Sequence, residues 1–122
     1  MNSSTRQTLA SAIQTLVGRK LSSVTFVADY IQLAFDGPEM NAYTTPTVTR
    51  GSESLTFGQP GYRDSICSQI DRLVERTGVD DQQLLLVFEN RTVFSISLRD
   101  DDYRGPEALM FSLDTKEGCW VV

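Results

Sequence analysis

The sequence contains no histidine among its 122 residues. This absence excludes nucleophiles activated by histidine, zinc bound through imidazole, and a histidine general base. Cysteine is also scarce, since two thiols, Cys67 and Cys119, make neither an all-cysteine zinc site nor a disulfide framework. The phosphate-binding patterns GxGxxG and GxxxxGKS/T do not occur. We therefore expect a protein that is not an enzyme and has no catalytic residue, no metal site and no cofactor.

Lysine occurs only twice, and the nine arginines are scattered among sixteen acidic residues, which gives a net charge of -5. Nucleic acids and anionic membranes require clustered Lys and Arg, so we expect neither as a partner. No apolar run approaches the length that spans a membrane. Both cysteines lie in apolar segments, so we expect buried free thiols and a cytoplasmic, reducing location.

The densest charge cluster is Asp100-Asp101-Asp102, followed by Gly105. A calcium loop would need a bidentate acid at its twelfth position, where this chain has Phe111. The cluster therefore indicates a solvated loop.

An ordinary hydrophobic content of 40% and a length of 122 residues predict a single domain, 1–122, with its own core. Leu9, Ile13 and Leu16 share one helical stripe with Ala12 and Val17, and Gly18 follows as a left-handed cap. The segment Met1–Ala28 lacks acidic side chains, as organellar transit peptides do, but an internal repeat, described below, favours the first helix of the domain.

Alternation of apolar and polar residues predicts a series of antiparallel strands joined by tight turns. Asp36-Gly37 is the strongest hairpin signal, and Pro46 indicates an edge or a bulge. The predicted strands are 24–27, 30–35, 40–49, 54–57, 84–88, 93–98, 108–113 and 119–122, with a second helix over 62–70 and a turn over 114–118.

The apolar pattern recurs without a gap at an interval of 53 positions. Ile31, Leu33 and Phe35 correspond to Leu84, Leu86 and Phe88, and further along Met40 corresponds to Val93 and Tyr43 to Ile96. We therefore expect an α+β fold of two helices and about eight to nine antiparallel strands. They would form two pseudo-symmetric α-β-β-β-β repeats, 5–58 and 61–113, that share one core, followed by the strand 119–122.

Residues Leu73–Val79 are a point of conflict between two patterns. Helical periodicity would extend the second helix through Leu73 and Val74 to Gly78, whereas the repeat predicts a strand and a helix that ends near Asp71.

Two polar clusters lie at the boundaries of the predicted repeats: Gly61-Tyr62-Arg63-Asp64 and Arg104-Gly105-Pro106-Glu107. A structural reading makes the first a helix N-terminus and the second a turn. A functional reading makes them a contact surface, because Tyr and Arg are enriched in interaction hot spots. The candidate partner-binding residues are Tyr62, Arg63, Asp64, Asp100, Asp102, Tyr103, Arg104 and Glu107.

The segments Asp29–Gly37, Pro60–Asp64, Ser97–Arg99 and Gly105–Ala108 resemble a family of small uncharacterised bacterial proteins. Proteins of this kind are similar in size and α+β make-up to immunity proteins that block a cognate toxin. That resemblance implies a protein partner and carries no activity with it.

Three functional hypotheses follow. The first is a cytoplasmic protein-binding module, monomeric or homodimeric, that would act as an immunity protein. The second is a small-ligand-binding domain with a pocket between the repeats lined by Tyr30, Tyr43, Phe57 and Tyr62. An enzyme built on Asp, Glu and Arg alone ranks third, because it would need a deep pocket holding two carboxylates.

Overall fold

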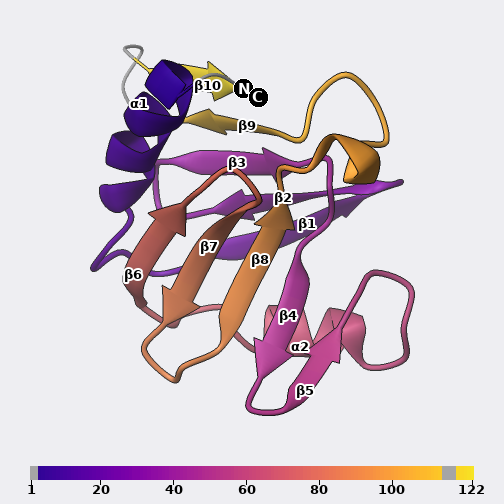
Figure 1. Cartoon of the computed structure of the whole chain (residues 1–122). Helices are drawn as coiled ribbons and strands as arrows, with labels where there is room; N and C mark the ends of the chain where they lie inside the picture. Colours follow the sequence, from indigo (N-terminus) through magenta and orange to yellow (C-terminus); the bar gives the residue numbers. More distant parts are fainter. Residues whose placement is uncertain (1–2, 114–117) are drawn as a thin grey trace.

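The computed structural model describes residues 3–113 and 118–122. Over these residues the chain is α+β, with two α-helices, ten antiparallel strands in two sheets and one short 3-10 helix. Figure 1 labels them along the chain. The elements are α1 (Ser3–Gln14), β1 (Ser23–Val27), β2 (Tyr30–Ala34), β3 (Glu39–Ala42), β4 (Thr47–Arg50), β5 (Glu53–Leu55), α2 (Tyr62–Cys67), β6 (Val74–Val79), β7 (Gln83–Phe88), β8 (Val93–Ser97), η1 (Asp100–Asp102), β9 (Leu109–Ser112) and β10 (Cys119–Val121).

The strands β1, β2 and β3 form an antiparallel meander. Ala28 turns the chain between β1 and β2 with φ of 45°, and Asp36-Gly37 closes the hairpin between β2 and β3 with φ of 58° and 130°. Glycine adopts the second of these conformations without a Cβ penalty. The hairpin predicted at Asp36-Gly37 is therefore confirmed.

A second meander consists of β6, β7 and β8. Its first strand, Val74–Val79, confirms the extended conformation that the repeat predicted for this segment. The helix before it is shorter than predicted, because α2 ends at Cys67 and residues 68–71 form turns.

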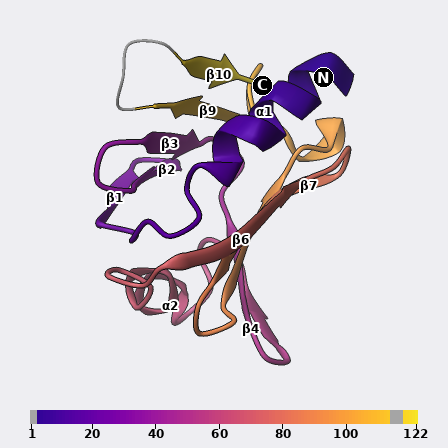
Figure 2. The same ribbon diagram turned by 90° about the vertical axis from the view of Figure 1, so that its left-hand side faces the viewer.

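Each sheet is completed by strands from the other part of the chain. The first sheet has the order β1-β2-β3-β9-β10, and the second has the order β5-β4-β8-β7-β6. Each half of the chain therefore contributes strands to both sheets, and neither half forms a sheet of its own. Figures 1 and 2 show the two sheets as separate layers whose strands run in different directions, with α1 near β10 and α2 at the opposite end near β4.

The long strand predicted over residues 40–49 is interrupted where the chain changes sheets. It separates into β3 in the first sheet and β4 in the second, with Pro46 just before β4. Pro46 has no backbone N–H to donate to a neighbouring strand. Its carbonyl oxygen accepts a hydrogen bond of 2.5 Å from the Tyr62 hydroxyl. The edge or bulge predicted from Pro46 is therefore wrong: this segment is a crossover between the sheets, and both β3 and β4 are interior strands.

The core lies between the two sheets and the apolar faces of the helices. Alternate residues of β2 and β7 point into it, and Ile31, Leu33 and Phe35 are fully buried together with their counterparts Leu84, Leu86 and Phe88. Val17 and Ile70, which the helical predictions included, are instead 39% exposed, and each lies in a turn after its helix has ended. The largest fully buried side chains are Tyr62, Phe35, Phe88, Phe94, Phe111, Leu9, Ile13, Leu16, Leu21, Ile31, Leu33 and Met40.

The strand β10 confirms the predicted C-terminal strand and pairs with β9. Trp120 packs against the core, with its ring centroid 6.1 Å from that of Phe111. Cys119 is exposed, which corrects the prediction that both thiols are buried, while Cys67 is half-buried. Most of the turn predicted over 114–118 lies outside the described residues.

The two meanders have hairpins of different length. The Phe35 amide donates to the Pro38 carbonyl, and the Phe88 amide donates to the Thr92 carbonyl. The second hairpin therefore contains one more residue between donor and acceptor than the first. In the sheets Ile31 is paired with Ala42, and Leu84, its counterpart in the repeat, is paired with Ile96. The ungapped correspondence of Tyr43 with Ile96 is therefore wrong beyond the hairpin. Ile96 takes the position of Ala42 instead.

Candidate functional site

Two neighbouring tyrosines lie on the outer face of the first sheet, at the end of the β2–β3 hairpin opposite its turn. Tyr30 begins β2, and Tyr43 follows directly after β3, next to the paired residues Ile31 and Ala42. Since Ile31 and Ala42 are fully buried, their strand neighbours face the opposite side of the sheet. The two phenol rings are half-buried, with centroids 5.2 Å apart and planes tilted by 55°.

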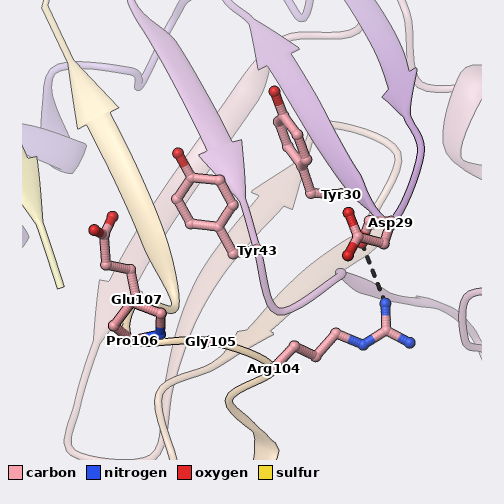
Figure 3. Close-up of a pocket in the computed structure, with 7 residues that line it drawn as sticks. All are labelled: Asp29, Tyr30, Tyr43, Arg104, Gly105, Pro106 and Glu107. Carbon is pink, nitrogen blue, oxygen red and sulfur yellow. Dashed lines mark hydrogen bonds between the residues drawn. The ribbon is translucent and has the colours of Figure 1, made fainter.

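These tyrosines line a hollow of about 300 Å³ that opens to solvent. We call it the tyrosine hollow; Figure 3 shows it. Its other wall comes from the chain between β8 and β9, where Glu107 is half-buried. The complete lining is Asp29, Tyr30, Tyr43, Arg104, Gly105, Pro106 and Glu107.

One hydrogen bond connects the two walls of the hollow. The Arg104 Nη1 donates to the backbone carbonyl of Asp29 at 3.2 Å, across 75 positions in sequence. In Figure 3 the guanidinium of Arg104 reaches toward the turn that carries Asp29. The hollow therefore combines one guanidinium that is bonded to the backbone with two carboxylates, those of Asp29 and Glu107.

Arg104 lies on a long connection between two strands, residues 98–108, which we call the extended connection. Residues 98–108 join β8 to β9, whereas residues 43–46 join β3 to β4 at the corresponding point of the other meander. The connection includes η1, whose three aspartates are all exposed. Burial and the neighbouring charge of Asp100 raise the pKa of Tyr103 above its ordinary value. Chain length beyond what the crossover requires is typical of segments that carry function.

The structure brings together only some of the predicted contact residues. Arg104 and Glu107 lie in the tyrosine hollow, while Asp102 lies outside its lining and accepts a hydrogen bond of 2.5 Å from the Ser97 hydroxyl. Asp100 is exposed on the same connection.

The other predicted cluster, around Tyr62, lies elsewhere on the domain. Tyr62 is only 1% exposed, so its inclusion in a contact surface is wrong. Burial raises the pKa of its hydroxyl far above the ordinary range. Arg63 is exposed and stacks over the Phe26 ring, 4.8 Å from the centroid, and Asp64 lies in the first turn of α2. This geometry favours the structural reading of the first cluster.

The predicted pocket lined by four aromatic residues does not form. The aromatic residues separate into the pair Tyr30–Tyr43 and the pair Phe57–Tyr62, whose centroids are 5.9 Å apart. Only the first pair lines the tyrosine hollow. Tyr30 and Tyr43 were predicted to line a ligand pocket and were not among the predicted contact residues. Their alternation with buried Ile31 and Ala42 was the signal that they face outward.

Over residues 3–113 and 118–122, no group of three or more acidic or cysteine side chains is arranged to hold a metal ion. Within the same residues, no helix is long and apolar enough to cross a membrane.

Comparisons with protein-family models, with curated proteins and with solved structures give no significant match to this chain. The resemblance to small bacterial proteins and to immunity proteins therefore stays a prediction.

Proposed function

We propose that the protein is a non-enzymatic, cytoplasmic protein-binding module that docks a basic segment of its partner in the tyrosine hollow. The observation that carries the proposal is the pair Tyr30–Tyr43 on the outside of the first sheet, half-exposed and walled by the extended connection. Large rigid aromatic side chains that are partly open to solvent are typical anchors of protein interfaces. If the partner is a toxin, occupation of its surface would block it, as immunity proteins do.

The charge around the hollow determines the chemistry of the partner. Asp29 and Glu107 lie in the lining, and the exposed aspartates of η1 lie on the same connection. The Arg104 guanidinium is directed to a backbone carbonyl. With a net charge of -5, the whole chain adds an attractive long-range field for a basic surface. A segment that carries Lys or Arg beside an apolar residue fits both the rings and the carboxylates.

The test is affinity purification from the native host with three forms of the tagged chain: the unchanged protein, the double variant Tyr30→Ser with Tyr43→Ser, and Val121→Ser. Val121 is 49% exposed on the edge strand of the same sheet and serves as a matched control. We expect a stoichiometric basic partner with the unchanged protein and with the control. Loss of one hot-spot tyrosine weakens binding by about thirtyfold, so the double variant should recover almost none.

Thermal unfolding of all three forms establishes that each is folded before binding is compared. Recovery of the monomer alone from the native host would contradict the proposal. Equal recovery of the partner by the folded double variant would show that binding occurs on another surface.

A further inference from the structure

The second sheet carries a different concave surface, which the proposed function does not use. It is a groove of about 490 Å³, within the range of about 300–1,000 Å³ that ligand sites occupy. We call it the hydroxyl groove. Its lining is dominated by neutral polar side chains, with one aromatic ring and three charged groups: Thr44, Thr45, Thr47, Thr56, Phe57, Gln82, Gln83, Ser95, Ser97, Arg99, Asp102 and Arg104.

Strand register places the floor of the groove side by side. Thr47 of β4 is paired with Ser95 of β8, and Gln83 of β7 is paired with Ser97. Their neighbours along the strands, Val48 among them, are buried, so these four side chains share the outer face. The Ser95 hydroxyl donates to Gln83 Oε1 at 2.6 Å, which fixes the amide with its NH2 group free to donate elsewhere.

A polar outer face alone is ordinary for an antiparallel sheet with one side in water. The walls of the hydroxyl groove distinguish this polar face from an ordinary one. On one side the chain after β5 contributes Phe57, and on the other the extended connection contributes Arg99 and Asp102. The Ser97 hydroxyl donates to Asp102 Oδ2 at 2.5 Å and accepts from the Arg99 amide at 3.2 Å, so the second wall is held to the floor.

We infer that the hydroxyl groove is a binding site for a neutral sugar. Ligand sites for apolar molecules are lined mainly by apolar side chains, whereas the lining of this groove is mainly polar. Hydroxyl and amide groups donate to and accept from sugar hydroxyls, and a carboxylate beside a guanidinium can bind two adjacent hydroxyls in the same way. The Phe57 ring provides an apolar surface for the C–H face of the sugar ring. Two guanidiniums and one carboxylate give the lining a net charge of +1, so phosphate is the competing ligand that the test includes.

The test can separate this site from the tyrosine hollow. Arg104 lines both surfaces, and Asp102 in the wall of the groove is one of the η1 aspartates on the same connection, but Tyr30 and Tyr43 line only the hollow and Gln83 lines only the groove. Arg104 is therefore left unchanged in the test. The groove also combines residues from both predicted repeats, since Thr47 and Phe57 belong to the first and Gln83 to the second.

The experiment is saturation-transfer-difference NMR of the full chain with glucose, galactose, mannose, xylose and N-acetylglucosamine, each tested separately, and with inorganic phosphate followed by protein chemical shifts. We expect a transfer signal from at least one sugar, with a Kd of about 1 mM, as for a ligand of about a dozen heavy atoms. We also expect little response to phosphate. Absence of a signal from every sugar overturns the inference, and so does a strong response to phosphate alone.

Two variants locate the signal. Gln83→Leu removes the amide from the floor and should reduce the transfer signal at least fivefold. Gln32→Leu makes the same change on the outer face of β2 in the other sheet and should leave the signal unchanged. Thermal unfolding verifies that both variants are folded. If a folded Gln83→Leu protein retains the full signal, the sugar binds elsewhere and the inference fails. The partner test in the native host is unaffected by either outcome, because it depends on Tyr30 and Tyr43.

Discussion

Lys20 and Leu73 form an isolated antiparallel β-bridge, and they are 53 positions apart, the interval of the predicted repeat. In an antiparallel pair related by a two-fold axis, a residue lies opposite its own counterpart. The hydrogen bonds on either side of the bridge agree with that arrangement. The Gly18 amide donates to the Val74 carbonyl at 2.8 Å, and the corresponding Asp71 amide donates to the Leu21 carbonyl at 2.7 Å.

The backbone conformation at this contact also corresponds. Gly18 has φ of 87°, and Asp71, its counterpart at the same interval, has φ of 78°. An aspartate tolerates this left-handed conformation better than most residues with a side chain. We propose from these matches that the two halves are related by a pseudo-two-fold axis near Lys20 and Leu73, with each half donating a hairpin to the sheet of the other.

The exchange of hairpins predicts that neither half folds alone. The β4–β5 hairpin pairs with β8, and β9–β10 pairs with β3. A protease site inserted at the exposed Gly58 would allow the chain to be cut between the halves. We expect the cut protein to elute as one species in native buffer, and the fragments to separate only in denaturant. Each isolated fragment should lack a cooperative unfolding transition by circular dichroism, and mixing should restore it.

The uncut protein with the same insertion is the control for this experiment. A cooperative transition in either isolated fragment would mean that its meander is stable without the donated hairpin, and would contradict the proposed interdependence.

A second prediction concerns Gln69, which is fully buried and whose Oε1 has no hydrogen-bond partner. Leu16, its counterpart in the first repeat, is also fully buried. An unsatisfied buried polar group costs about 1–3 kcal/mol, so Gln69→Leu should raise the free energy of unfolding by about that amount. Urea denaturation measures the change. The same substitution at exposed Gln7 is the control and should change stability little. A destabilised Gln69→Leu protein would show that the amide is needed in the core.

Local structure was predictable from the sequence where neighbours along the chain determine it. The Asp36-Gly37 hairpin follows from a turn dipeptide between alternating strands, and the β6 segment follows from the repeat. The pairing of β3 with β9 was not predictable in this way. Alternation indicates which face of a strand is buried, but it does not specify which distant strand becomes its neighbour.

The candidate site was predicted only in part, because local sequence patterns identify some of its residues but not which distant segments come together. Arg104 and Glu107 were identified from local composition, and the structure places both in the tyrosine hollow. Tyr62 was assigned to a contact surface because tyrosine is common in interfaces, although it lies one helical turn before buried Ile66 on the same stripe. That spacing indicated the core. The groove around Ser95 and Gln83 depends on register between strands, which the sequence did not reveal.

A third prediction concerns Gly118, where a Cβ atom would lie 2.5 Å from the Trp120 ring. Gly118→Ala should displace the ring from its position against Phe111 and lower the free energy of unfolding by about 1–3 kcal/mol. Because Trp120 is the only tryptophan, its fluorescence reports the displacement directly. Gly78→Ala is the matched control, since a Cβ there meets no atom within 4 Å. Unchanged emission and stability in Gly118→Ala would contradict the close packing of Gly118 and Trp120.

The last prediction is an alkaline loss of stability caused by Tyr62. Burial raises the pKa of its hydroxyl well above the ordinary value of 10.0. The folded protein therefore keeps this proton above pH 10, while the unfolded chain releases it. The stabilisation is fully present below pH 10 and decreases as the pH rises above it, by about 1.4 kcal/mol per pH unit for one group.

Tyr62→Phe separates this effect from general alkaline unfolding. At pH 7 the variant should be less stable by about 1–3 kcal/mol, because the buried Pro46 carbonyl loses its hydrogen bond. Above pH 10 the difference from the unchanged protein should narrow, since phenylalanine has no proton to release. Urea denaturation from pH 7 to pH 11 measures both values, with Tyr43→Phe, which removes a half-exposed hydroxyl, as the control. A stability difference that stays constant across this range would show that Tyr62 does not govern the alkaline transition.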